Sequence, residues 1–471
     1  MTVAYEGHGV TVHIADALDV LAGIADASVD AVVTDPPYGL EFMGKEWDAP
    51  WKQGADVHAE ARNRRAEEMG DENKRRYIAS AVNKYAAGLP FQQWCEMWAT
   101  ECLRVLKPGG HLLAFGGTRT WHRLACAIED SGFEVRDSIA WLYGSGFPKS
   151  LDVSKAIDRA AGAEREASGV RGNTQCGYLD RGEQCPGHDD AGQSMSGATV
   201  HRLPTAPATD AAREWEGWGT ALKPAFEPVV VARKPLVGTV AQSVLTHGTG
   251  ALNIDGCRIS MSNEDRAIVN NRSGAGFGTG DTVGANQGRA AGKFTSAPAG
   301  RWPANVVLDE SQAEALDEQS GTQRDGVAVK RNGRTESADG WGNIGKAAVG
   351  TPDETYGGQG GASRFFYVAK ADASERPRVN GTAHPTVKPL DLMRWLVRLV
   401  TPPGGTILEP FAGSGTTVEA CIVEGFDCIA IEKGDEYLPL IMQRINRRRD
   451  PVEAIRQRGE DLGLFDLEGT P

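Results

Sequence analysis

The strongest constraint on the fold is a glycine-rich loop near the end of the chain, between two apolar runs. Residues 406–409 form the first run, and Pro-Phe-Ala-Gly-Ser-Gly-Thr-Thr follows at 410–417. A helical pattern then extends to Glu424, and the second run, 428–431, ends in Glu432. Glycines let the backbone approach a ligand closely, and an acid ~20 residues beyond the loop is typical of α/β folds that bind a ribose. The order strand, glycine loop, helix and strand therefore predicts a ligand-binding α/β unit. The loop lacks the Gly-Lys-Ser or Gly-Lys-Thr of a P-loop, which argues against a nucleotide triphosphate.

Apolar runs and helical patterns alternate through the first third of the chain and return after residue 389. Lys107-Pro108-Gly109-Gly110 is typical of a turn between a helix and the following strand. Strands that alternate with helices usually pair in parallel and are covered on both faces. The sequence thus predicts the α/β class, a mostly parallel twisted sheet with helices on both faces, interrupted by loop-rich insertions. Strands are predicted at 10–14, 31–34, 111–115, 138–142, 227–232, 364–368, 406–409 and 428–431, and helices at 17–25, 91–105 and 392–400.

The charge balance restricts how the chain could bind a polyanion. Lys and Arg total 50 against 63 Asp and Glu, so the chain is acidic and lacks the overall positive field of a nucleic-acid coat protein. Any nucleic-acid contact must be local. Two basic stretches, at 62–76 and 444–449, are candidates, although solvated helix faces have the same composition.

The cysteines and the apolar runs indicate the compartment. Eight cysteines are scattered through a chain that has no apolar leader and no run long enough to span a bilayer. We therefore expect a reduced, cytoplasmic protein without a membrane partner. Cys176, Cys185 and His188 have a spacing that suggests a metal site, but no fourth ligand is evident. No bound metal is therefore predicted.

A second motif, Asp35-Pro36-Pro37-Tyr38, directly follows the predicted strand 31–34, at the edge where open α/β sheets bind ligands. The Asp35 carboxylate and the Pro36 carbonyl can both accept hydrogen bonds from one amino group, and Tyr38 offers a flat face for a planar ring. Two acceptors on an amino group favour the pyramidal nitrogen that attacks a methyl sulfonium. The same residues also suit a strand-ending turn, and the motif alone leaves both interpretations open.

Together, the motifs at 35–38 and 411–415 resemble the signature of the amino-methyltransferases of DNA. The first motif precedes the glycine loop, with His-Pro-Thr-Val-Lys-Pro at 384–389 just ahead of the loop, which resembles the beta-group permutation of that family. The segments 141–149 and 219–228 resemble members found in bacteriophages and bacteria. The likeness covers most of the chain outside the two insertions. It implies a Rossmann-like fold that uses S-adenosyl-L-methionine as its cofactor.

The resemblance also implies roles for individual residues. Asp35, Pro36 and Tyr38, with Pro37 completing the motif, would hold a target base that has rotated out of the duplex. Glu409 stands where the family usually has Asp, so its reach to the amino group of the cofactor differs. Phe411, Gly413 and Gly415 would line the cofactor, Glu432 would bind its ribose, Asp16 would face its adenine, and Thr386 with Lys388 would lie near its methionine carboxylate.

The expected activity is transfer of a methyl group to N6 of adenine in double-stranded DNA, by base flipping and direct in-line attack. Asp at the first motif position leans toward adenine in the family, whereas Ser or Thr leans toward N4 of cytosine, which is the first alternative. An RNA or protein amide methyltransferase and a non-catalytic DNA-binding or antirestriction module are the others. Methylation at C5 of cytosine is disfavoured because no Pro-Cys pair is present.

The predicted division of the chain follows these motifs. It gives a catalytic half of the core at 1–160, a polar insertion at 161–216, a core strand region at 217–236, an insertion for target recognition at 237–362, a cofactor-binding half at 363–449 and a tail at 450–471. The recognition insertion is rich in Arg, which can contact base edges or phosphates. Neither the recognition sequence nor the oligomeric state, monomer or dimer, follows from these patterns.

Overall fold

The computed structural model describes residues 3–39, 88–146, 150–166, 205–261, 300–324, 359–370, 375–379 and 381–447. The chain divides into two compact units, Ser145–Ala225 and a larger unit made of Met1–Gly144 and Phe226–Pro471. The predicted polar insertion, 161–216, falls inside the smaller unit, and the predicted boundaries remain a prediction.

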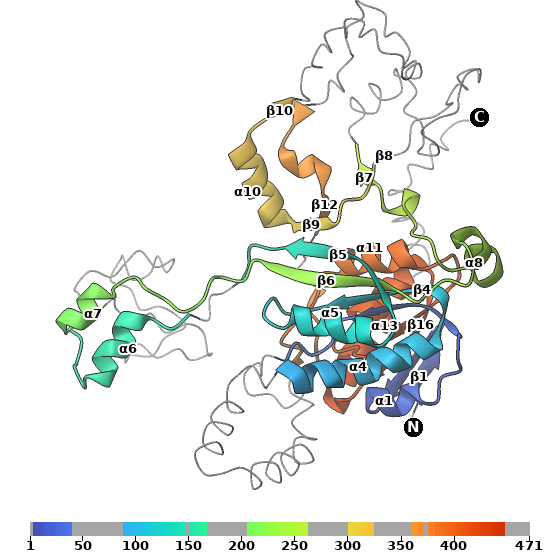
Figure 1. Ribbon diagram of the computed structural model, residues 1–471, viewed down its shortest axis with the longest axis horizontal. Helices are drawn as coiled ribbons and strands as arrows, with labels where there is room; N and C mark the ends of the chain where they lie inside the picture. Colours follow the sequence, from blue (N-terminus) through green and yellow to red (C-terminus); the bar gives the residue numbers. More distant parts are fainter. Residues whose placement is uncertain are drawn as a thin grey trace, which may run out of the picture. The chain divides into compact units, whose positions relative to one another are not determined.

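A ten-stranded sheet forms the larger unit, in the order β1-β2-β16-β15-β3-β4-β6-β5-β9-β12 (Figure 1). Only β1 and β6 run antiparallel to their neighbours among the described strands of this sheet. The predicted α/β class is thereby confirmed. The strands are β1 Val3–Gly7, β2 Val10–Ile14, β3 Val29–Thr34, β4 Leu106–Phe115, β5 Glu134–Leu142, β6 Phe226–Arg233, β9 Val306–Asp309, β12 Tyr367–Ala369, β15 Thr406–Glu409 and β16 Asp427–Glu432.

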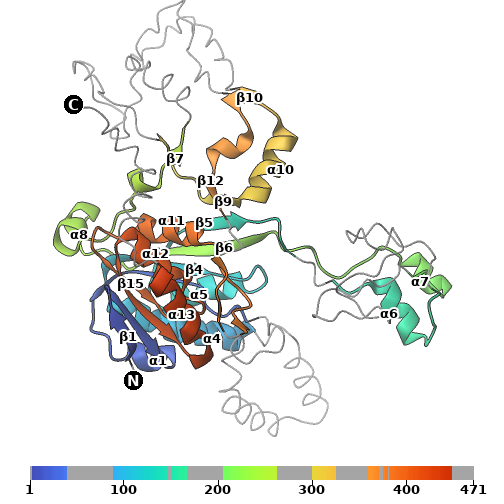
Figure 2. The same cartoon turned by 180° about the vertical axis from the view of Figure 1, so that it is seen from behind.

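Helices cover both faces of this sheet, and each face has its own apolar core. Helices α1 (Ala17–Leu21), α4 (Gly88–Val105) and α5 (Trp121–Asp130) pack on one face, and α4 and α5 lie in front of it in Figure 1. Helices α11 (Leu390–Val400), α12 (Thr416–Glu424) and α13 (Leu438–Arg447) pack on the other, which faces the reader in Figure 2. The apolar spacing of α4 explains its position, because Phe91, Cys95, Trp98, Cys102 and Val105 are all buried. Burial of each large apolar side chain contributes about 1.5–3 kcal/mol.

The strand order reverses between β15 and β3, which pair in parallel at the centre of the sheet. From β15 the chain passes through α12 to β16 on one side, and from β3 it passes through α4 to β4 on the other. Loops that leave neighbouring strands in opposite directions open a crevice at the carboxyl ends of those strands. Both predicted motifs begin there, since Asp35 follows β3 and Pro410 follows β15.

Three predictions of local structure were wrong in part. The predicted strand 364–368 begins as a 3₁₀-helix, η6 (Ala362–Phe365), because the backbone amide and hydroxyl of Ser363 bond to Asp317 of α10 (Glu310–Ser320). The predicted turn 107–110 lies within β4, which begins directly after α4 and pairs with β3 through a register shift between Val29 and Ala31. The helix predicted at 17–25 ends at Leu21.

Short elements complete the larger unit between its main strands. Helix α8 is Val240–His247, and the 3₁₀-helices η5 and η8 are Asp255–Cys257 and Asp435–Tyr437. Two-stranded antiparallel sheets are formed by β7 (Ile259–Ser260) with β8 (Gly300–Arg301), β10 (Gln323–Arg324) with β11 (Gln359–Gly360), and β13 (Arg378–Val379) with β14 (Thr382–Ala383).

The smaller unit contains two helices, α6 (Val153–Ala160) and α7 (Asp210–Glu214). Asp158 joins them, because its buried carboxylate accepts hydrogen bonds from the backbone amides of Ala208 and Thr209, both 3.0 Å away. The Arg165 guanidinium binds the same carboxylate.

Candidate active site

A cavity of about 380 Å³ opens at the carboxyl ends of β3 and β15. Both sequence motifs contribute to it, although Thr34 at the end of β3 and Glu409 at the end of β15 are 375 residues apart in the chain. All predicted site residues except Gly415 line this cavity, namely Asp16, Asp35, Pro36, Pro37, Tyr38, Thr386, Lys388, Glu409, Phe411, Gly413 and Glu432.

The glycine loop needs its glycines for two different reasons. Gly413 has a φ of 52° and lines the cavity, and its amide donates to Glu432 Oε2 at 2.7 Å. Gly415 has a φ of 80° and is the N-cap of α12, and a Cβ at this position would lie 3.1 Å from the Cα of Ile441 in α13. A Cβ at Gly413 would lie 3.2 Å from Nε2 of His384, so Gly413 lets the loop approach that ring, whereas Gly415 lets α12 and α13 approach each other.

Glu432 ties the glycine loop to the end of β16. Its second carboxyl oxygen accepts from the amide of Gly434 at 2.8 Å. Burial raises the pKa of Glu432 above its ordinary value, although the amides of Gly434 and Gly413 oppose the increase. Each carboxyl oxygen has two lone pairs, so both can still accept a hydroxyl of a ligand.

Glu409 is 1% exposed and lies at the centre of a polar cluster beneath the loop. The hydroxyl oxygens of Thr34 and Thr417 lie 2.5 and 2.6 Å from its two carboxyl oxygens, and the Phe411 amide donates to it at 3.0 Å. Burial raises the pKa of Glu409 from 4.5 to about 8, despite these hydrogen bonds. Burial thus favours the protonated form of Glu409. Its expected contact with a cofactor remains a prediction.

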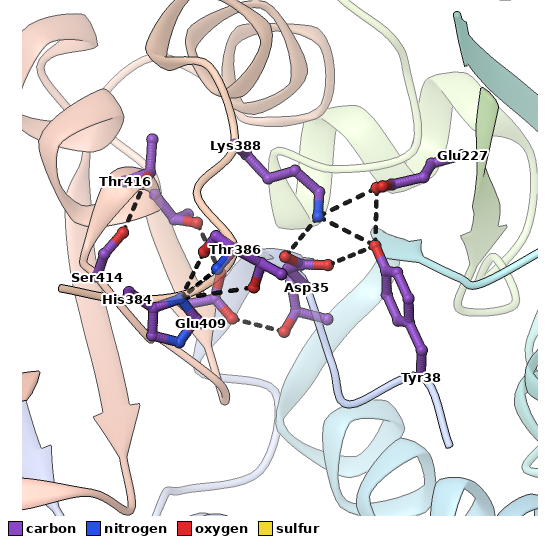
Figure 3. A network of polar contacts seen from close by, with 11 residues as sticks. Asp35, Tyr38, Glu227, His384, Thr386, Lys388, Glu409, Ser414 and Thr416 are labelled. Atoms are coloured by element: carbon purple, nitrogen blue, oxygen red, sulfur yellow. Dashed lines mark hydrogen bonds and ion pairs between the residues drawn. The ribbon is translucent and has the colours of Figure 1, made fainter. Parts of the chain in front are cut away.

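Asp35 belongs to a buried network with Lys388, Tyr38 and Glu227 of β6 (Figure 3). The Lys388 ammonium lies 2.6 Å from Asp35 Oδ2, 3.1 Å from Glu227 Oε2 and 3.0 Å from the Tyr38 hydroxyl. The Tyr38 hydroxyl lies 2.8 Å from Asp35 Oδ1 and 2.9 Å from Glu227 Oε2. The motif therefore does more than end a strand.

Electrostatics in this network favour a charged lysine and a neutral tyrosine. Burial alone would lower the pKa of Lys388, but Asp35 and Glu227 raise it above its ordinary value. Burial, together with the same two carboxylates, raises the pKa of Tyr38 well above its ordinary value. The network thus places one ammonium between two acidic side chains.

Aromatic side chains form the apolar wall of the cavity. The Phe411 ring lies 5.6 Å from the rings of both Trp94 and Trp98 of α4, measured between centroids. On another side, His384 contacts the Tyr437 ring at 4.7 Å and the Thr386 carbonyl. These surfaces offer flat, apolar contacts for a planar ring.

Asp16 also lines the cavity, close to Lys433. Its carboxylate accepts from the amide of Leu18, which caps α1, and forms an ion pair with Lys433 at 3.1 Å. The cap and the ion pair give Asp16 a structural role after strand β2. Its contact with the adenine of a cofactor remains a prediction.

Several residues at this site were missed or misjudged in the sequence. Glu227 belongs to the recognised segment 219–228 but carried no predicted role, and the helical spacing of Trp94 and Trp98 indicated only a core helix. Arg444 was grouped with an exposed basic stretch, and this was wrong. It is fully buried, pairs with the buried Glu419, and donates to the carbonyl of Ser414 in the glycine loop at 3.0 Å.

Some predictions lie outside the described residues: the basic stretch 62–76, Arg448, Arg449 and the trio Cys176, Cys185 and His188. Within the described ranges, no group of three or more His, Cys, Asp and Glu side chains could hold a metal ion. No helix in the same ranges is long and apolar enough to cross a membrane.

Comparison with known proteins decides the family. The sequence model of the N6/N4 family, described as DNA methylase, matches residues 29–159 and 302–443. The match includes both motifs of the cavity, at 35–38 and 411–415. The chain belongs to the N6/N4 DNA methylase family. This confirms the resemblance that the two motifs predicted.

Curated proteins and solved structures are similar to parts of the chain. The type II methyltransferase M.HindIII of Haemophilus influenzae is 24% identical over 241 residues, which are 48% of this chain and 59% of that protein. The DNA adenine methyltransferase YhdJ of Escherichia coli K12 is 38% identical over 63 residues, 13% and 21% of the two chains. This chain thus spans less than two thirds of these relatives. Among solved structures, the cytosine-N4-specific PvuII DNA methyltransferase aligns with a TM-score of 0.41 and 11% identity over 97% of this chain and 94% of that chain.

Proposed function

We propose that this protein is an S-adenosyl-L-methionine-dependent DNA methyltransferase that modifies N6 of adenine. The observation that carries the proposal is that Asp35 and Tyr38 share one cavity with the glycine loop of β15. Hydrogen-bond acceptors for an amino group thereby lie beside a pocket of the kind that binds nucleotides. Membership of the N6/N4 DNA methylase family supports the same reaction class.

The residues of the cavity fit this cofactor. A cavity of about 380 Å³ lies within the range of small-molecule sites, roughly 300–1,000 Å³. Phe411 and Trp94 form an apolar wall for an adenine, and Glu432 offers carboxyl oxygens to ribose hydroxyls. When bound, S-adenosyl-L-methionine would supply an electrophilic methyl group on a positively charged sulfur.

In the proposed mechanism, the residues of the first motif hold and orient the target amine. Asp35 and the Pro36 carbonyl accept hydrogen bonds from the amino group of a base rotated out of the duplex, while the Tyr38 ring contacts the base. Positioning the nitrogen for in-line attack contributes most of the rate. The Asp35 carboxylate stabilises the positive charge that develops on nitrogen, so it need not remove a proton first.

Adenine is preferred to cytosine because Asp35 occupies the first motif position, and the similarity to YhdJ over a short segment agrees with it. The deciding experiment is transfer of labelled methyl from S-adenosyl-L-methionine to unmethylated duplex DNA, followed by mass analysis of the nucleosides. We expect N6-methyladenine. N4-methylcytosine would correct the base and keep the reaction, whereas cofactor binding without label in DNA would redirect the search to RNA or protein amides.

The variant Asp35→Ala separates chemistry from cofactor binding. We expect it to abolish turnover, because Asp35 is assigned to the target amine and not to the cofactor. The Kd for S-adenosyl-L-methionine should stay within about twofold, which corresponds to ~0.4 kcal/mol. Glu314→Gln, an exposed position on α10, is the matched control. Turnover by Asp35→Ala at the rate of the control would refute the role of Asp35.

A further inference from the structure

Both oxygens of the Asp35 carboxylate, which is expected to bind the target amine, already accept hydrogen bonds from the protein. Lys388 donates to Asp35 Oδ2 at 2.6 Å, and the Tyr38 hydroxyl lies 2.8 Å from Oδ1. The Lys388 ammonium is itself an amino group held by Asp35, in the place where an exocyclic amine would donate. A base that binds Asp35 therefore shares these two oxygens with two donors of the protein, which weakens the bond of each donor to Asp35.

Both competing donors have the same second acceptor, Glu227 Oε2. It lies 3.1 Å from the Lys388 ammonium and 2.9 Å from the Tyr38 hydroxyl oxygen (Figure 3). A tyrosine hydroxyl has one proton, so it can bond to Asp35 or to Glu227 at a given moment but not to both equally. Rotation of that O–H, with no movement of the ring, transfers the bond to Glu227.

Lys388 needs a carboxylate partner because its side chain is 8% exposed. A buried ammonium that loses its counter-ion is strongly disfavoured, since water no longer solvates it. If Asp35 turned to a base and no second acid were present, Lys388 would be left in that state. Glu227 is fixed within the sheet, since its backbone lies in β6 between β4 and β5.

We propose that Glu227 is a positioning residue for the target base, which takes over the Lys388 ammonium and the Tyr38 hydroxyl when the amino group binds Asp35. The inference rests on the proposed function and adds an exchange of partners to it. It assigns Lys388 to the base side of the cavity, next to the catalytic carboxylate. No covalent step is involved, because only hydrogen bonds and one ion pair change partners.

The test is the full-length Glu227→Gln variant, compared with the control Glu314→Gln. We expect kcat/KM for duplex DNA to fall about 10- to 100-fold, and the Kd for S-adenosyl-L-methionine to stay within about twofold. A duplex with 2-aminopurine next to the methylated adenine, whose position is located first by mapping the wild-type product, reports extrusion of that adenine by its fluorescence. The extruded fraction should fall in Glu227→Gln.

A double-mutant cycle with Lys388→Met separates this exchange from a merely structural role. With Lys388 removed, no ammonium has to change partner, so Glu227→Gln should then cost less than about threefold in kcat/KM. Glu227→Asp, which keeps the charge, should lose less activity than Glu227→Gln and covers the case in which the amide variant fails to fold.

Three results would overturn the inference: wild-type kcat/KM in Glu227→Gln, an equal loss with and without Lys388, or equal losses for the Asp and Gln variants. Absence of methyl transfer to DNA by the wild-type protein would overturn the proposed function as well. Failure of the function thus appears in the wild-type protein, whereas failure of this inference appears only in the variants.

Discussion

Replacing Glu409 with Gln should remove a large pH dependence from the stability of the core. The pKa of Glu409 is raised by burial from 4.5 to about 8 in the folded protein. In the unfolded chain the carboxyl ionises near 4.5, while in the folded protein it stays protonated up to about 8. The stability linked to this group is therefore fully present below pH 4.5 and is lost as pH rises through 8.

The size of the effect follows from the shift. One pKa unit corresponds to ~1.4 kcal/mol, so the free energy of unfolding should fall on the order of 3 kcal/mol between pH 5 and pH 8 through Glu409 alone. Glutamine cannot ionise, and it fits the same contacts. Its carbonyl can accept from Phe411 and Thr34, while its amide can donate to the Thr417 hydroxyl.

The assay is urea unfolding followed by tryptophan fluorescence at several pH values between 5 and 8. The quantity to follow is the free energy of unfolding of Glu409→Gln minus that of the wild type, because other titrating groups cancel in this difference. We expect it to rise with pH in favour of the variant, and the exposed control Glu314→Gln to give a flat line. A difference that stays constant for Glu409→Gln would mean that Glu409 ionises normally and would refute the reasoning.

Two further substitutions test how the glycine loop is supported. Arg444→Met leaves Glu419 buried without its counter-ion and should lower the free energy of unfolding, measured in urea, by about 3–5 kcal/mol. The double variant Arg444→Met with Glu419→Gln should regain much of this stability. A loss below ~1 kcal/mol in the single variant would contradict the burial of the pair. Gly415→Ala places a methyl at a φ of 80° against Ile441 and should cost about 1–3 kcal/mol, whereas Gly404→Ala, also at positive φ but with open space around it, should cost less. Equal losses would argue against the contact with α13.

Part of the site was predictable from one rule of parallel sheets, while the roles of Asp16, Thr386 and Lys388 came from the family resemblance. Asp35 and the glycine loop each come directly after an apolar strand, and the carboxyl ends of parallel strands lie at the same edge. Their meeting in one cavity could therefore be expected from the pattern alone. Glu432 was predicted for the same reason, at the end of the next strand.

The remaining parts depend on pairing and burial that local patterns do not encode. Glu227 reaches the site because β6 runs antiparallel between β4 and β5, and neither its direction nor its register can be read from its apolar residues. Arg444 lies beside Arg447 in a basic stretch, where composition favours an exposed face. Its burial follows from Glu419, an acid on a different helix that the sequence gives no reason to connect with it.

The central pairing of β3 with β15 has a consequence for the time at which the protein can fold on the ribosome. Thr34 and Glu409 are 375 residues apart, and at about 5–20 residues per second the second strand emerges ~20–75 s after the first. During this interval one side of β3 has no neighbour, although every residue of the strand is buried in the finished sheet. An unpaired apolar strand is prone to pair with other chains. The nascent chain therefore needs protection, by chaperones or by transient contacts of its own, until its last strands are synthesised.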